Sequence, residues 1–334
     1  MKFLITGGCG FIGRNLIKFL LEETSNSQIR IVDNFSVGKL QDLSYASNNF
    51  TQVSSLDAKW EKNKIEVIEG DILDADLAFR LSSGADVIIH LAANTGVGPS
   101  VENPRMDCVT NVTGTFNYLE ACRINKIPKF VFASSGAPIG NCTPPIHEEM
   151  PCHPVSPYGA SKLAGEAYCS AYFNSFGVDT VALRFGNAYG PGSTHKGSVV
   201  AKFIRKAMNG ENLEIYGNGA QTRDFIFTAD IVRAINQAAI TNSIGGEVFQ
   251  IATNRETNVS ELTETLVSIL KNKGVSGFNV IHGEKRVGDV LRNFSDTTKA
   301  QNLLKWASEY DISSGLSTTV DWFISRLKIM QNEE

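Results

Sequence analysis

Short apolar runs alternate with segments of helical periodicity along the first 250 residues. Several of the runs are apolar at almost every position, which is typical of parallel strands buried on both faces. The runs that predict strands lie at residues 3–5, 29–32, 65–68, 86–93, 129–133, 180–184 and 248–251. Helical patterns are expected at 14–20, 104–125, 158–176, 198–209 and 228–240. This alternation predicts a doubly wound α/β sheet that binds ligands at the carboxyl ends of its strands.

The pattern changes after Gly186, where two glycine-rich loop signals flank a single helical segment. The strand expected at 248–251 then returns the chain to the first domain, and the last 80 residues hold two or three amphipathic helices. We therefore expect one domain of residues 1–186 plus about 224–252, and a smaller one of 187–223 plus about 253–334. The polar segment 44–63 is assigned no structure.

Composition and charge narrow the class of protein. The 334 residues are 42% hydrophobic and 20% charged, as in soluble globular proteins. A net charge of −4 without clustered basic residues predicts no nucleic-acid partner and no anionic membrane surface. No apolar stretch reaches the roughly 20 residues of a membrane span, and the N-terminus is not of the signal-peptide type. The six cysteines show no CxxC pair and no metal spacing, so we expect reduced thiols, no metal and a cytoplasmic protein.

The glycines of the first turn carry the first chemical signal. Gly7, Gly10 and Gly13 follow the strand at 3–5 and precede a helical pattern. In this order the first glycine allows a tight turn, the second lets the backbone approach a pyrophosphate, and the third lets the helix pack closely on the strand. The N-terminus of the helix then presents unpaired N–H groups to the phosphates. This pattern favours a dinucleotide site.

Asp33 supports this interpretation. It ends the strand at 29–32 and lies twenty residues after Gly13, where a dinucleotide fold needs a carboxylate for the adenosine ribose. Because a carboxylate at this point repels a 2′-phosphate, NAD is favoured over NADP.

A tyrosine, a lysine and a serine form the candidate catalytic group. Tyr158 and Lys162 are four residues apart in a helical segment, and therefore share one face. We expect the nearby ammonium to lower the tyrosine pKa from its usual value near 10, which would make the phenol a usable base. Ser134 and Ser135 follow the strand at 129–133, at the edge of the sheet where ligands bind. A serine hydroxyl is therefore expected to hydrogen-bond the substrate oxygen whose proton Tyr158 removes.

With these features the sequence resembles the extended short-chain dehydrogenase/reductase family over nearly the whole chain, and most closely its NAD-dependent nucleotide-sugar 4-epimerases. The resemblance implies a Rossmann sheet with a smaller C-terminal α/β substrate domain, NAD as cofactor, and Ser135, Tyr158 and Lys162 as catalytic residues. The implied cofactor contacts are Gly7, Gly10, Phe11, Ile12, Gly13, Asp33, Asn34, Ser36, Gly38, Asp71, Ile72, Leu91, Ala92, Ala93, Asn111, Ser134, Tyr158, Lys162 and Phe185.

The resemblance also implies a nucleotide-sugar site in the second half of the chain. Val200 and the run 213–216 resemble the segments that enclose uracil, while Arg223 and Arg286 resemble the two arginines that clamp the diphosphate. The implied substrate contacts are Thr95, Ser135, Tyr158, Asn187, Val200, Glu214, Tyr216, Arg223, Arg286, Asp289 and Asn293.

Four positions depart from the family pattern. Ile139 stands where the family usually has a tyrosine, so the sugar contacts at this position are not predicted. Gly136 and Ala137 stand where dehydratase relatives carry an acidic pair and decarboxylase relatives a glutamate, so the departure favours epimerisation. Asn293 replaces the tyrosine of epimerases restricted to glucose and galactose, and its smaller side chain leaves room for an N-acetyl group.

The predicted activity is inversion of C4 in a UDP-hexose through a transient 4-keto sugar. UDP-glucose, UDP-N-acetylglucosamine and UDP-glucuronate all remain open as substrates, with a nucleotide-sugar dehydratase or decarboxylase as the alternative enzyme. A non-catalytic NAD-binding scaffold is the alternative from another class, although the serine, tyrosine and lysine are all present. The resemblance further implies that the helices at 104–125 and 158–176 pair across a two-fold axis in a homodimer.

Overall fold

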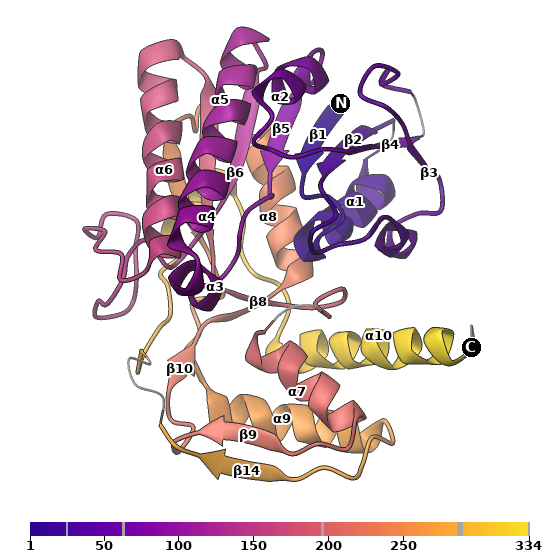
Figure 1. The fold of residues 1–334 in the computed structure, drawn as a ribbon. Helices are drawn as coiled ribbons and strands as arrows, with labels where there is room; N and C mark the ends of the chain where they lie inside the picture. Colours follow the sequence, from indigo (N-terminus) through magenta and orange to yellow (C-terminus); the bar gives the residue numbers. More distant parts are fainter. Residues whose placement is uncertain (25, 62–63, 195–196, 286–289, 333–334) are drawn as a thin grey trace.

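A parallel sheet of eight strands forms the centre of the protein, in the order β12-β7-β6-β5-β1-β2-β4-β3 (Figure 1). The computed structural model describes residues 1–24, 26–61, 64–194, 197–285 and 290–332. The strands of the sheet are β1 (Lys2–Thr6), β2 (Gln28–Asp33), β3 (Phe50–Gln52), β4 (Ile65–Glu69), β5 (Val87–His90), β6 (Lys129–Ser135), β7 (Asp179–Phe185) and β12 (Glu247–Ile251). The chain builds outward from β1 in both directions, which confirms the predicted doubly wound fold and places the switch of strand order between β1 and β5.

Both faces of the sheet are buried, and consecutive residues of each strand supply alternate faces. In β1, Leu4 packs into one hydrophobic cluster while Phe3 and Ile5 pack into the other. Helices α1 (Phe11–Glu23) and α8 (Thr228–Ile240) cover the face of Phe3 and Ile5. The opposite face is covered by α2 (Ala75–Ser82), α5 (Gly114–Ile124) and α6 (Pro157–Phe176). Burial on both sides explains why these strands are apolar at nearly every position.

The helix expected at 104–125 consists of three joined pieces. Asn103 caps its start, because its side-chain oxygen accepts a hydrogen bond from the backbone N–H of Met106 at 3.0 Å. The segment runs through α4 (Pro104–Cys108), a π-helical turn η2 (Val109–Thr113) and α5. Such π turns are frequent at functional sites, and this one carries Asn111.

A smaller part of the molecule lies beyond the carboxyl edge of the sheet (Figure 1). It contains the parallel pair β9 (Leu213–Tyr216) and β14 (Val280–Gly283), and the helices α7 (Val199–Met208), α9 (Val259–Asn272) and α10 (Ile312–Asn332). A separate hydrophobic cluster joins them, with Phe203, Leu266 and Leu316 among its buried members. The remaining pairs are β8 (Asn187–Tyr189) with β11 (Phe225–Phe227), which is parallel, and β10 (Thr222–Arg223) with β13 (Thr257–Asn258), which is antiparallel.

The structure differs from the sequence prediction in several segments. The polar segment 44–63 begins at the end of a short 3₁₀ helix, η1 (Leu40–Tyr45), and includes the edge strand β3. The strand expected at 86–93 ends at His90, and the next residues leave the sheet to pass over the glycine turn. The short elements that were not predicted include α3 (Val97–Glu102) and the π turn η3 (Ala300–Leu304). Among the helices of the described ranges, none combines the length and apolar composition that a bilayer crossing requires.

Candidate active site

The glycine turn has the close packing that its sequence predicts. Gly7 has a φ of +68°, and a Cβ atom on it would lie 2.9 Å from the Ala92 backbone. A Cβ on Gly13 would lie 2.6 Å from the carbonyl oxygen of Gly7. Gly10 is the N-cap of α1, and no side chain caps this N-terminus. The backbone N–H groups of Phe11 and Ile12, in the first turn, are therefore not occupied by a capping side chain. This cradle fits a pyrophosphate group.

Asp33 ties the end of β2 to this turn. One carboxylate oxygen accepts the N–H of Cys9 and the other accepts the N–H of Phe35, both at 2.9 Å. Burial raises the pKa of Asp33, and these hydrogen bonds oppose the rise. Gly38 lies against the same turn, because a Cβ on it would be 2.1 Å from the Cys9 carbonyl oxygen. The structure therefore brings Asp33 and Gly38 to the glycine turn, as the prediction requires.

The predicted adenosine contacts lie next to one another. The Asn34 side-chain amide donates to a carboxylate oxygen of Asp71 at 3.1 Å, and the N–H of Ser36 donates to the Asn34 side-chain oxygen at 3.1 Å. Asn34, Ser36 and Asp71 are exposed, whereas Ile72 is buried beneath α5, against Gly114. The three polar side chains can hydrogen-bond a ligand, whereas the Ile72 side chain packs in the interior.

Asn111 organises the segment that follows β5. Its side chain accepts the N–H of Asn94 at 2.7 Å and donates to the Asn94 carbonyl at 3.0 Å. The same amide donates to the Ser161 hydroxyl at 3.0 Å. The preceding residues, Leu91, Ala92 and Ala93, are half-buried, and the N–H of Leu91 donates to the Thr6 carbonyl at 3.2 Å. Asn111 thus links the glycine-turn neighbourhood to α6.

Lys162 and Tyr158 begin α6 beside the end of β6. The Lys162 ammonium is buried, donates to the Ala133 carbonyl at 2.8 Å, and lies 6.0 Å from the centre of the Tyr158 ring. Ser135 ends β6 opposite Phe185 of β7, so both predicted residues stand at the carboxyl edge of the sheet. Ser134 points toward α6, where its hydroxyl donates to Glu166 at 2.5 Å.

The protonation states differ from the sequence prediction. Burial raises the pKa of Tyr158 to about 12, while a hydrogen bond with Ser135 acts in the opposite direction and the charge of Asp107 adds to the rise. Burial also lowers the pKa of Lys162 to about 8. The lowered tyrosine pKa expected from Lys162 is therefore not found in the chain by itself, where desolvation has the largest effect on the phenol.

The predicted substrate contacts lie on several elements. Val200 is buried in α7, and Glu214 and Tyr216 are half-buried on β9, where the Lys202 ammonium lies 3.3 Å from the Tyr216 hydroxyl. Arg223 on β10 donates to the Val290 carbonyl at 2.7 Å. These elements lie in the smaller part of the molecule, apart from β6 and α6 (Figure 1).

The other predicted substrate contacts are more scattered. Thr95 and Asn187 are exposed, and the N–H of half-buried Asn293 donates to the Thr222 hydroxyl at 3.3 Å. Arg286 and Asp289 lie outside the described residues.

Comparison with known proteins decides the family. The family model described as "NAD dependent epimerase/dehydratase family" matches residues 3–252. The chain belongs to this family. A putative UDP-glucose 4-epimerase of Methanocaldococcus jannaschii is 35% identical over 96% of this chain and 97% of its own length. A dTDP-glucose 4,6-dehydratase of Streptomyces niveus is 31% identical over 97% of this chain and 93% of its own length.

Solved structures agree with this assignment. The UDP-N-acetylglucosamine 4-epimerase from Methanobrevibacter ruminantium, in complex with UDP-N-acetylmuramic acid, has a TM-score of 0.85 at 30% identity, covering 97% of this chain and 98% of that one. The chain is thus a member of the nucleotide-sugar epimerase and dehydratase group, and the predicted family, Rossmann fold and NAD cofactor are confirmed. The glycine cradle and Asp33 fit the cofactor that names the family.

The departures from the family pattern have clear positions in the structure. Ile139 is buried with 1% of its surface exposed, so it packs in the interior and offers no polar atom to a sugar. A Cβ atom on Gly136 would meet nothing within 4 Å, which leaves open space beside Ser135. Neither Gly136 nor Ala137 carries an acid.

Two buried acids beside the catalytic group were not predicted from the sequence. Glu166 forms an ion pair with Arg184 at 2.6 Å, and each side chain is only 4% exposed. Its spacing of four residues from Lys162 was a usable signal, because it places Glu166 on the same helix face. Asp107 is fully buried and accepts the Asn111 amide at 3.1 Å. Its charge adds to the rise in the pKa of Tyr158 and partly opposes the lowering of the Lys162 pKa by burial. No sequence pattern marked it.

Proposed function

We propose that this enzyme inverts C4 of a UDP-hexose, with NAD bound at the glycine turn. The observation that carries the proposal is the group of Ser135, Tyr158 and Lys162 at the carboxyl edge of the sheet, next to open space at Gly136 and without an acid at Gly136 or Ala137. A dehydratase needs a further acid/base pair for elimination across C5–C6. The described neighbourhood of Ser135 supports the epimerase within a family that contains both kinds of enzyme.

In this proposal Tyr158 exchanges a proton with the 4-hydroxyl of the sugar, and Ser135 hydrogen-bonds the same oxygen. When bound, NAD supplies a reversible acceptor for the hydrogen and electron pair of C4. Lys162 is protonated at neutral pH, since its pKa lies near 8, and its charge stabilises the phenolate form of Tyr158. The 4-keto sugar turns over in the site and receives the hydrogen on its opposite face, so no net oxidation occurs.

The proposed substrate site extends from this group to the smaller part of the molecule. We assign the nucleotide to Val200, Glu214 and Tyr216, and the diphosphate to Arg223, which ends β10 and pairs with Thr257 of β13. In the same proposal residues 1–186 with about 224–252 bind the cofactor, and the remaining residues form the substrate domain. The return of β12 to the large sheet beside β7 supports this division.

The small side chain of Asn293 supports a substrate with a group larger than hydroxyl at C2. UDP-N-acetylglucosamine is therefore our first candidate, with UDP-glucose and UDP-glucuronate as the others. Proton NMR of the protein with NAD and each nucleotide sugar tests the proposal. A new anomeric signal of galacto configuration supports it, whereas a stable 4-keto or pentose product would assign the alternative enzyme.

We further propose that the enzyme is a homodimer joined through α4, α5 and α6. Apolar side chains remain exposed on these helices, including Met106 at 53%, Phe116 at 38% and Phe176 at 55%. Phe116 also contacts Tyr168 edge-on, with ring centres 5.6 Å apart, so aromatic groups of α5 and α6 form one surface. A second copy of the same surface would bury it.

A further inference from the structure

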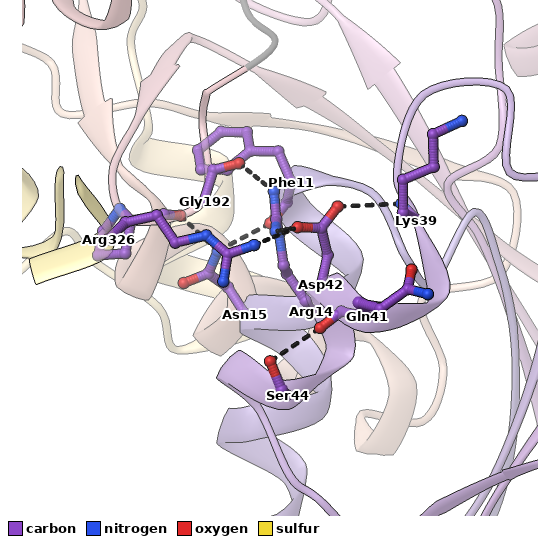
Figure 2. Close-up of polar contacts among 10 residues, drawn as sticks. Phe11, Arg14, Asn15, Lys39, Gln41, Asp42, Ser44, Gly192 and Arg326 are labelled. Atoms are coloured by element: carbon purple, nitrogen blue, oxygen red, sulfur yellow. Dashed lines mark hydrogen bonds and ion pairs between the residues drawn. The ribbon is translucent and has the colours of Figure 1, made fainter. Parts of the chain in front are cut away.

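A buried polar cluster outside the predicted contacts joins four segments that are far apart in the sequence (Figure 2). At its centre the Arg14 guanidinium of α1 lies 3.1 Å from a carboxylate oxygen of Asp42 in η1. Only 3% of the Arg14 side chain and 12% of the Asp42 side chain are exposed. Removing one partner of such a buried ion pair strongly destabilises the surrounding structure, because the other charge is left buried without a counter-charge.

Arg14 also holds the turn that follows β8. It donates a hydrogen bond to the Gly192 carbonyl at 2.5 Å, and the next residue of α1, Asn15, donates to the Pro191 carbonyl at 2.9 Å. Gly192 has a φ of +86°, and a Cβ on it would lie 2.9 Å from Arg14, so the contact leaves no room for a side chain. The helix that begins at the glycine turn therefore fixes a segment that leads to α7.

Asp42 holds the loop that follows Asp33. Its second carboxylate oxygen accepts the N–H of Lys39 at 3.0 Å. The preceding residue, Gly38, is packed against the carbonyl of Cys9 in the glycine turn. One carboxylate oxygen of Asp42 thus binds Lys39 in the predicted cofactor loop, and the other contacts Arg14, the residue after Gly13 of the glycine turn.

Helix α10 closes the cluster from the far end of the chain. Arg326 lies 3.5 Å from the oxygen of Asp42 that faces Arg14. The Trp322 ring stands edge-on to Tyr45 of η1, with centres 6.0 Å apart, and lies 6.0 Å from the Arg14 guanidinium carbon. None of the predicted cofactor contacts belongs to α10, and it is through Arg326 and Trp322 that this helix reaches Asp42 and Arg14.

We propose that the Arg14–Asp42 pair is a positioning latch that sets the affinity for NAD, and that docking of α10 tightens it. The latch holds the loop at 34–39 against the glycine turn before the cofactor arrives, which removes part of the ordering cost of binding. By linkage, NAD that binds the ordered loop stabilises the docking of α10. The proposal rests on the NAD site and not on the identity of the sugar.

The first test compares two carboxylate-to-amide variants. Asp42→Asn removes the charge of the latch, whereas Glu66→Gln removes the charge of a matched buried pair, Arg30–Glu66, whose side chains are 2% and 6% exposed at a distance of 2.7 Å. We expect calorimetry to show an NAD dissociation constant raised at least ~10-fold by Asp42→Asn, which corresponds to about 1.4 kcal/mol. Glu66→Gln should leave it within about twofold. An unchanged dissociation constant in Asp42→Asn would overturn the proposal.

The second test uses a milder variant that keeps the buried pair. Arg326→Gln removes a side chain that is 37% exposed, so the fold should persist. In the unmodified protein we expect NAD to slow amide hydrogen exchange over 312–326, and this effect should shrink in Arg326→Gln. Exchange in α10 that does not respond to NAD in the unmodified protein would overturn the coupling, whatever sugar the enzyme uses.

Discussion

The Lys162 ammonium lies 6.0 Å from the centre of the Tyr158 ring and donates its hydrogen bond to the Ala133 carbonyl of β6. Both side chains are held in low-dielectric surroundings, which raises the pKa of Tyr158 to about 12 and lowers that of Lys162 to about 8. In the chain by itself, burial works against the charged form of each group. In the proposed mechanism, the binding of substrate and cofactor must therefore complete the activation of Tyr158.

The lowered pKa of Lys162 predicts a pH-dependent stability. Between about pH 8 and 10.5 the unfolded chain binds a proton at Lys162 that the folded chain does not, so the stability contribution of this residue rises with pH. Relative to Lys162→Met, the unmodified protein should gain roughly 3 kcal/mol in free energy of unfolding across this window. The raised pKa of Tyr158 acts in the opposite direction only above pH 10. Urea unfolding at pH 8, 9 and 10 measures the difference, and a difference independent of pH would contradict the assignment.

Tyr158→Phe should abolish turnover while leaving nucleotide-sugar binding nearly intact. The substitution removes only the hydroxyl that exchanges the proton, and such groups contribute about 10²- to 10⁴-fold to rates. Tyr168→Phe is the matched control, because Tyr168 lies ten residues further along the same helix and is exposed. Turnover measured with saturating nucleotide sugar should fall only in the first variant. Full activity of Tyr158→Phe would remove this residue from the mechanism.

Gly38→Ala should disrupt the cofactor cradle. The added Cβ would lie 2.1 Å from the Cys9 carbonyl oxygen, so the loop and the glycine turn must separate. We expect the NAD dissociation constant to rise at least ~10-fold. In Gly98→Ala the new Cβ meets nothing within 4 Å, and NAD binding should stay unchanged. Equal NAD affinities in the two variants would show that the loop at Gly38 does not shape the site.

Glu166→Gln should destabilise the fold by about 3–5 kcal/mol, because it leaves the Arg184 guanidinium buried without its counter-charge. The same change at Glu22, whose side chain is 60% exposed in its ion pair with Lys18, should cost less than about 1 kcal/mol. Urea unfolding of the two variants measures the contrast. Equal losses in the free energy of unfolding would contradict the prediction, because they would mean that water solvates the Glu166–Arg184 pair.

The exposed apolar surface of α5 and α6 predicts the oligomeric state. Light scattering at micromolar concentration should give twice the chain mass of 36.3 kDa. Phe116→Lys places a charge at the centre of this surface and should yield the mass of one chain. A mass of one chain for the unmodified protein would contradict the dimer.

The sequence was sufficient to predict the doubly wound sheet and the position of the glycine turn. Apolar residues such as Leu4 and Ile5 occupy both faces of a strand only when helices cover both faces of the sheet. The apolar runs therefore predict a sheet with helices on both sides. The spacing from Gly13 to Asp33 likewise follows from the length of one helix and one strand, and the structure brings the Asp33 carboxylate to the turn.

Other features depend on contacts between distant segments. Arg14, Asp42, Gly192 and Arg326 meet in one cluster, but each is an ordinary residue in its local sequence. The pKa of Tyr158 was predicted in the wrong direction for the isolated chain, because spacing reports the neighbouring charge and not the burial. The edge strand β3 has only three residues, two of them exposed, and so carries no apolar pattern.

The most direct test of the account is proton NMR of the enzyme with NAD and UDP-N-acetylglucosamine, UDP-glucose or UDP-glucuronate in deuterated water. A 4-epimerase should give a new galacto-configured anomeric signal from at least one sugar. Every ring carbon should carry hydrogen and not deuterium, because the hydrogen of C4 leaves and returns without exchanging with solvent. A 6-deoxy methyl signal with deuterium at C5 would identify a dehydratase. That result, or three unchanged spectra, would contradict 4-epimerisation of a UDP-hexose.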